Sequence, residues 1–102
     1  MELRQLNSLC LIAHHGTVKE AAKRSFLTSS AVSLQIKTLE RELVIKLFDH
    51  VGKKLVLTAK GESLYQDARR ILDSVREALE RTVTATGEFT GRISMVAPAA
   101  RR

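Results

Sequence analysis

The sequence predicts a mainly α-helical fold, in which three short helices and a small two-stranded hairpin are followed by one long helix. Aromatic residues are scarce, with three Phe, one Tyr and no Trp, so the core must be built from Leu, Ile, Val and Ala. Only one Pro and five Gly interrupt 102 residues, which favours long helices. Apolar residues also recur at helical spacing along most of the chain. The 44% hydrophobic content is ordinary for a globular protein, and the length suits one small domain with an appendage.

The first helix is predicted over residues 2–15, where Leu and Ile recur at helical spacing, and Gly16 follows as a stop. Cys10 lies on the apolar stripe and is the only cysteine, so no internal disulfide can form. His14 and His15 are neighbours and point about 100° apart on a helix. A solvated helix end therefore fits them better than a metal site.

A helix-turn-helix is predicted over residues 17–41. Its first, short helix begins at a capping box formed by Thr17 and Glu20 and ends near Ser25. Two alanines in its middle allow another helix to cross close by. Thr28 then caps the next helix, predicted over residues 28–42. A short helix, a tight turn and an amphipathic helix are typical of this motif, although an ordinary αα-hairpin has the same outline.

The helix over residues 28–42 has two distinct faces. Its apolar stripe is formed by Val32, Ile36, Leu39 and Leu43, at positions i, i+4, i+7 and i+11. The opposite face carries hydroxyl and basic groups, namely those of Ser30, Ser33, Lys37 and Arg41, together with Leu34. Such a face suits a DNA groove, where hydroxyls and amines meet phosphates and base edges. In an isolated helix, a plain solvated face would be the favoured interpretation.

A β-hairpin is predicted after this helix, over about residues 44–57. Residues 44–48 and 55–57 are mostly apolar and include β-branched valine and isoleucine, and they bracket a basic loop that contains Gly52. A hairpin in this place is a wing, which would bring Lys53 and Lys54 to the DNA backbone or the minor groove. A solvated basic turn is the alternative.

The long helix is predicted over residues 59–88. Its apolar stripe is too long for a small domain to bury, so it needs a partner, most simply the same helix of a second copy. Docking on the chain's own first helix is the alternative, and we expect the start of the helix to pack in this way and the remainder to pair. The stripe consists of Leu64, Ala68, Ile71, Leu72, Val75, Leu79 and Val83.

Charge is unevenly distributed along the chain. The formal net charge is +6, and residues 1–58 hold nine Lys or Arg against five Asp or Glu, which leaves +4. A basic segment favours a polyanionic partner, either nucleic acid or an anionic membrane surface. The N-terminus has no signal-peptide pattern, and no apolar run reaches the ~20 residues of a membrane span. No Ser-His-Asp set, metal-ligand spacing or phosphate-binding Gly loop is apparent, so an enzyme is disfavoured.

Taken in order, these elements resemble the N-terminal half of LysR-type transcriptional regulators. The resemblance rests on MELRQL, GTVKEAAKR, TSSAVSLQIKTLERELVIKLFDH, LVLTAKGE and GRISMV. It implies a winged helix-turn-helix domain over residues 1–58, a dimerising linker helix over residues 59–88, and a hinge with the first strand of an effector-binding domain over residues 89–102. It further implies a bacterial, cytoplasmic and nucleoid-associated regulator, a tetramer built from two such dimers, and a small-molecule inducer bound outside this chain, which itself would hold no cofactor.

The resemblance also implies residue roles. Thr28 resembles a phosphate-contacting cap and Lys37 a basic residue that reaches phosphate. The major-groove positions are those of Ser29, Ser30, Ser33 and Leu34, and the wing positions those of His50, Lys53 and Lys54. The sequence departs from the family where Ser29 and Ser30 replace Gln and Pro, Leu34 and His50 replace Arg, and Val44 replaces Gly.

Leu34 is the most informative departure, because an apolar side chain stands in the middle of a polar face. It would contact a thymine methyl group, or it is simply a tolerated exposed leucine. The leading functional hypothesis is sequence-specific binding of duplex DNA by a dimer. The alternative is a helical protein–protein interaction module that does not bind DNA.

Overall fold

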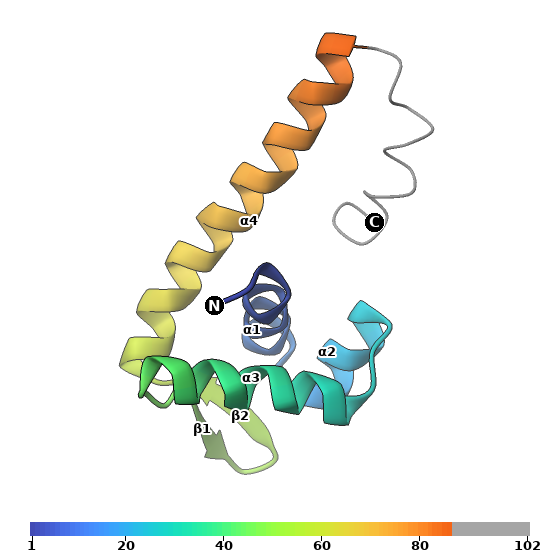
Figure 1. The fold of residues 1–102 in the computed structure, drawn as a ribbon. Coiled ribbons are helices and arrows are strands. Elements are labelled where there is room, and N and C mark those ends of the chain that lie inside the picture. The colour runs from blue at the N-terminus through green and yellow to red at the C-terminus, as the bar shows by residue number, and fades with distance from the viewer. Residues whose placement is uncertain (87–102) are drawn as a thin grey trace. The chain divides into compact units, whose positions relative to one another are not determined.

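The computed structural model describes residues 1–86, which form four helices and one hairpin (Figure 1). The mainly helical fold that the sequence predicts is confirmed. By its internal contacts the chain divides into two units, Met1–Arg69 and Arg70–Arg102. The predicted hinge and strand over residues 89–102 lie outside the described residues. In chain order the elements are α1 (Leu3–His15), α2 (Val18–Ser25), α3 (Ser29–Leu43), β1 (Phe48–Val51), β2 (Lys54–Leu57) and α4 (Ala59–Thr86).

The core of the first unit is aliphatic, as the composition predicts. α1, α2 and α3 pack against one another in all three pairs, and β2 also contacts α1. Two of the buried residues are the neighbouring alanines of α2, whose small side chains let helices approach closely. The buried apolar residues are Leu6, Leu9, Ile12, Ala21, Ala22, Val32, Ile36, Leu39, Leu47, Phe48 and Ala68.

At the α1–α2 junction the predicted glycine stop and the Thr17 cap are present, but the Glu20 half of the predicted capping box is not. Gly16 ends α1 in the left-handed region, with φ of 87°, and its N–H donates to the carbonyl of Ile12 at 2.7 Å. Thr17 caps α2 by accepting a hydrogen bond from the N–H of Glu20 at 3.1 Å. The carboxylate of Glu20 does not reach back; it accepts a hydrogen bond from Arg24 at 3.2 Å. This bond lowers the pKa of Glu20, and the charges of Lys23 and Arg24 act in the same direction.

The first predicted strand, over residues 44–48, is wrong. Val44 ends α3 in the left-handed region, with φ of 57° and ψ of 42°, so the chain turns there and does not extend. The carboxylate of Glu40 then accepts a hydrogen bond from the N–H of Leu47 at 2.8 Å and holds the turn against α3. The strand begins only at Phe48, where the chain leaves this turn.

The hairpin has a two-residue turn, because Val51 pairs with Lys54 in the antiparallel register. Gly52 has a positive φ of 64°, as the first central residue of a type II′ turn requires. The outer edge of β2 is tied to the helices, since the N–H of Leu55 donates to the carbonyl of Gly16 at 2.8 Å. The wing is therefore fixed to the end of α1.

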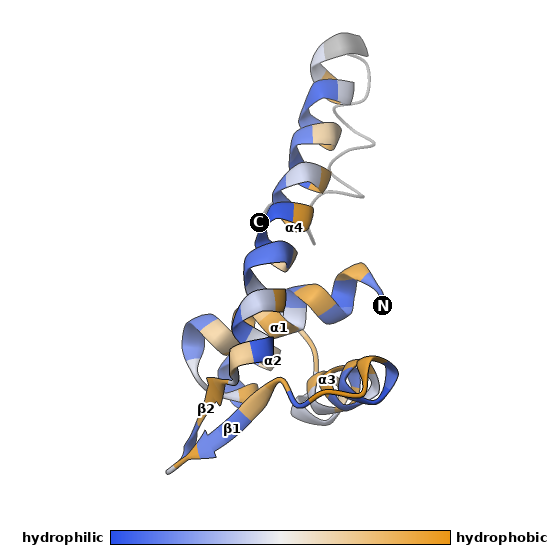
Figure 2. Ribbon diagram, turned by 90° about the vertical axis from the view of Figure 1, so that its left-hand side faces the viewer, coloured by the Kyte–Doolittle hydropathy of each residue, from blue (hydrophilic) through white to orange (hydrophobic). Residues whose placement is uncertain are grey.

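The start of α4 packs within the first unit, as the sequence predicts. The hydroxyl of Thr58 caps it by accepting a hydrogen bond from the N–H of Gly61 at 3.0 Å. Gly61 is buried, and a Cβ on it would stand 2.2 Å from the carbonyl oxygen of Leu47. Hydrophilic and hydrophobic residues alternate along the helix (Figure 2). No helix in the described part of the chain combines the length and apolar character that crossing a membrane requires.

Candidate nucleic-acid interface

α3 is held by one face and leaves the other free. Val32, Ile36 and Leu39 are 0%, 7% and 0% exposed, which confirms the predicted apolar stripe at these positions. The side chains on the opposite face are solvent-exposed, except that Ser33 is half-buried. The exposed residues of this face are Ser29, Ser30, Leu34, Lys37 and Arg41.

The N-terminus of α3 is open to an anion. Thr28 has an extended backbone and its hydroxyl oxygen accepts a hydrogen bond from the N–H of Ala31 at 3.1 Å. Thr28, Ser29 and Ser30 are all exposed. The first N–H groups of a helix have no partner within it, and the helix dipole adds partial positive charge there. This end of α3 can thus bind a phosphate through hydroxyl and backbone groups together.

The basic groups near this face are not neutralised by the protein itself. Lys37, Lys53 and Lys54 are exposed and form no ion pair within residues 1–86. Other cations of the same unit do: Lys46 lies 3.5 Å from Asp49, and Arg24 pairs with Glu20. The unpaired charges are available to an external polyanion.

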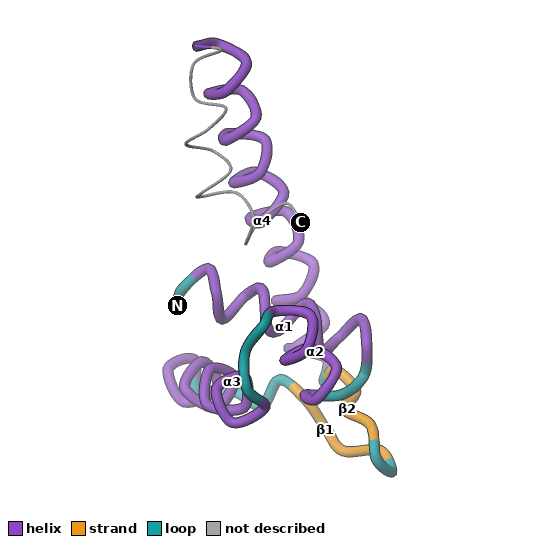
Figure 3. Tube along the Cα trace, turned by 90° about the vertical axis from the view of Figure 1, so that its right-hand side faces the viewer, coloured by secondary structure: helices purple, strands orange, loops and turns teal. Residues whose placement is uncertain are grey.

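The predicted wing residues have three different settings. His50 is exposed and lies opposite Leu55 in the hairpin, while Lys53 is the second residue of the turn. The side chain of Lys54 lies over the C-terminal end of α1, since a Cβ atom placed on Gly16 would be 3.5 Å from its Cδ. Figures 1 and 3 show α3 and the hairpin together at the lower side of the first unit. The two predicted binding elements can therefore approach one surface.

α2 contributes basic residues that were not among the predicted site residues. Lys19 and Lys23 are exposed and form no ion pair within the described residues. They stand four residues apart, so they share one side of the helix, away from the buried Ala21 and Ala22. This spacing is visible in the sequence and could have identified them.

The predicted dimerisation residues fall into two groups. Ala68 is fully buried within the first unit and Leu64 is half-buried there, so the start of the stripe is used by the domain itself. The stripe beyond Arg69 retains exposed apolar surface: Ile71 is 37% exposed, and the others are partly exposed. These others are Leu72, Val75, Leu79 and Val83.

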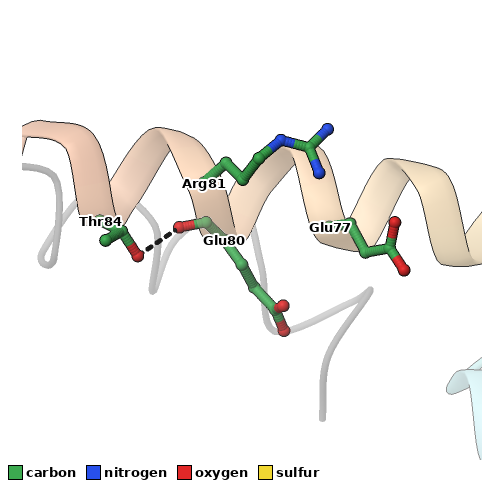
Figure 4. A pocket seen from close by; sticks show the side chains of 4 residues that line it. All are labelled: Glu77, Glu80, Arg81 and Thr84. Carbon is green, nitrogen blue, oxygen red and sulfur yellow. Dashed lines mark hydrogen bonds between the residues drawn. The ribbon is translucent and has the colours of Figure 1, made fainter.

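The described residues form no candidate metal site, because they contain no group of three or more His, Cys, Asp or Glu that could hold a metal ion. The rings of His14 and His15 stand edge to face with centroids 4.6 Å apart. A shallow hollow on α4 is lined by Glu77, Glu80, Arg81 and Thr84 (Figure 4). Within it the hydroxyl of Thr84 donates to the backbone carbonyl of Glu80 at 2.9 Å, as on an ordinary solvated helix.

The sequence is similar to those of bacterial regulators. It is 35% identical over 95 residues to an uncharacterised HTH-type transcriptional regulator in the ibpB-leuC intergenic region of Azotobacter vinelandii, covering 93% of this chain and 66% of that protein. It is 34% identical over 93 residues to the RuBisCO operon transcriptional regulator of Allochromatium vinosum, covering 91% of this chain and 31% of that one. The chain therefore spans less than two thirds of these relatives.

The fold is similar to those of solved DNA complexes. The CbnR_DBD–DNA complex matches with a TM-score of 0.76 and 33% identity, over 83% of this chain and 98% of that one. The BenM_DBD/benA site 1 DNA complex matches with a TM-score of 0.79 and 29% identity, over 86% of this chain and all of that one. The sequence profile of the bacterial regulatory helix-turn-helix proteins of the lysR family matches residues 3–62, and the chain belongs to this family.

Proposed function

We propose that this chain binds duplex DNA sequence-specifically, as the DNA-binding part of a bacterial transcriptional regulator. The observation that carries the proposal is the free face of α3, where exposed hydroxyls, an apolar side chain and an unpaired lysine lie opposite a fully packed core stripe. An α-helix fits the major groove, which presents a different pattern of donors, acceptors and methyl groups for each base pair. The solved structures most relevant to this face are of related domains in complex with DNA.

In this proposal some residues of α3 contact the DNA backbone and others contact the bases. Thr28, with the first N–H groups of the helix, binds a phosphate, and Lys37 binds another. The side chains at the first two turns reach base edges. Their hydroxyl groups can contact hydrogen-bond donors or acceptors of the bases, and an apolar side chain contacts the methyl group of thymine. The base-reading residues are Ser29, Ser30, Ser33 and Leu34.

The wing and α2 add contacts that position the domain on DNA. Lys53, at the turn of the hairpin, and His50 approach the minor groove, and Lys54 reaches the backbone from beside Gly16. Lys19 and Lys23 extend the basic surface along α2. Such contacts carry little sequence information, but they supply much of the affinity and make it depend on salt.

The chain acts as a dimer through the apolar stripe of α4 beyond Arg69. A pairing helix leaves two copies of α3 to bind two half-sites, as in other dimeric helix-turn-helix proteins. Dimers of the whole regulator would assemble into a tetramer in the cytoplasm, associated with the nucleoid, with a small-molecule inducer bound outside this chain. This part of the proposal rests on family membership.

Selection of bound sequences from a random DNA pool, followed by measurement of Kd against salt, tests the proposal. We expect enrichment of two related half-sites. With Lys19, Lys23, Lys37 and Lys54 of two protomers on phosphates, the logarithm of the association constant should fall with the logarithm of the salt concentration with a slope of about −7. Lys37→Ala should reduce that slope by about 2 in magnitude, whereas Arg81→Ala, on the far part of α4, should leave it unchanged. A dimer that enriches no sequence and ignores DNA would support the protein–protein interaction module instead.

A further inference from the structure

A partly buried side-chain hydrogen bond joins α1 directly to α3. The hydroxyl of Ser8 donates to Oε1 of Gln35. Ser8 is 1% exposed, and Gln35 is half-buried in the middle of α3. All buried side-chain polar atoms in the described part of the chain have a partner, so this pair is a satisfied element of the core.

The other core contacts of α3 have a different character. Val32, Ile36 and Leu39 hold the helix through apolar packing, which depends on contact area and shape and has little directional preference. A hydrogen bond depends steeply on distance and angle. A bond between the middle of α3 and a second helix therefore restricts rotation of α3 about its own axis and sliding along it more sharply than packing alone.

We propose that Ser8 and Gln35 are a positioning pair that sets the rotation of α3 and thereby determines which bases the protein prefers. The inference rests on the proposed function. Gln35 follows Leu34 directly, so any rotation of the helix moves both. For side-chain tips about 5–6 Å from the axis, a rotation of about 10° moves a tip by about 1 Å. A base-edge hydrogen bond tolerates only about 0.5 Å, whereas a flexible lysine on a phosphate adjusts.

Three variants of the 102-residue chain test this role: Ser8→Ala, Gln35→Met and the double variant. Each single change leaves one polar partner behind in the core, so each should lower the unfolding temperature. The double change removes both partners and should recover most of the loss. The ratio of Kd for a random duplex to Kd for the selected operator should nevertheless fall about tenfold in the double variant, which equals the discrimination of one good base contact. Its Kd for the random duplex and the salt slope should remain those of the original chain.

Ile36→Val is the matched control, because it weakens the same helix–core contact without touching the hydrogen bond. It should lower the unfolding temperature and leave the Kd ratio unchanged. A double variant with recovered stability and an unchanged ratio would overturn the inference, as would an equal loss of ratio in Ile36→Val.

A measurement without DNA separates this inference from the proposed function. Residual dipolar couplings of backbone amides report the orientation of α3 relative to α1 in the free protein. We expect the double variant to change this orientation and Ile36→Val to preserve it. An unchanged orientation in the double variant overturns the positioning role even if DNA binding holds. If the original chain shows no operator preference, the proposed function fails, and the couplings alone decide whether the pair positions the helix.

Discussion

Val44 is a strained end to α3, and replacing it with glycine should stabilise the protein. Its φ of 57° and ψ of 42° lie in the left-handed region, where a β-branched residue is a rare outlier. Its side chain is 85% exposed, so removing it gives up almost no packing. Glycine adopts this conformation freely and is the usual residue at this point of a helix end. The family commonly has Gly here, and the conformation explains why.

The expected gain follows from three terms. Relief of the left-handed conformation is worth about 1–2 kcal/mol. The greater chain entropy of glycine in the unfolded state costs about 0.5–1 kcal/mol, and the small lost burial costs about 0.3 kcal/mol. At the midpoints of these ranges, Val44→Gly should therefore raise the unfolding free energy by about 0.5 kcal/mol, which corresponds to a rise in Tm of about 2–4 °C for a domain of this size.

Thermal unfolding followed by circular dichroism measures this effect. Both proteins must be compared at one concentration, since association makes Tm concentration-dependent. Val51→Gly is the matched control: Val51 is also an exposed valine, at 61%, but it lies in β1 without a positive φ. There glycine should lower stability by up to about 1 kcal/mol. A fall in Tm for Val44→Gly similar to that of the control would refute the reasoning.

Three further changes test other parts of the structure. Gly61→Ala should destabilise by about 1–3 kcal/mol in chemical denaturation, because the new Cβ would stand 2.2 Å from the backbone oxygen of Leu47, while Ser63→Ala in the same turn should be neutral or slightly stabilising. Leu34→Ala should weaken DNA binding by about 1 kcal/mol on duplexes with a thymine at the contacted position and much less on those without the methyl group, measured by fluorescence anisotropy. Leu79→Arg should shift the chain from dimer to monomer in light scattering, since a charge would enter the apolar stripe of α4.

Each of these has a clear contrary outcome. An alanine at position 61 that stabilises the protein would show that α4 does not approach the 45–47 turn closely. Equal losses for Leu34→Ala on all base substitutions would leave an exposed leucine without a role in base reading. A dimer that persists in Leu79→Arg would place the dimer interface elsewhere.

The helices were predictable because their local signals agree with the packing. The signals at the helix ends act within a few residues of the chain. Gly16 ends α1, and Thr17 and Thr28 cap α2 and α3, as their positions predict. The apolar period of α3 likewise required no knowledge of its neighbours. The helix-turn-helix and its free face could therefore be derived from the chain itself.

The hairpin start and the role of Gly61 depend on contacts between distant residues. The apolar run after α3 resembles a strand, but Glu40 binds the N–H of Leu47 and holds part of that run in a turn. Gly61 appears as an ordinary helix residue until Leu47 is placed against it. The Ser8–Gln35 bond spans 27 residues, and no local pattern indicates it. The long-range backbone and polar contacts of the fold could therefore not be predicted from the sequence.

The central claim is that the free face of α3, with the wing turn, is the surface that meets DNA. Titration of the isotope-labelled chain with its selected duplex, followed by amide chemical shifts, tests this most directly. We predict that the largest changes fall on residues 28–37 and 52–54 and saturate with the same Kd as anisotropy. Changes confined to α4, or none at saturating DNA, would contradict the account.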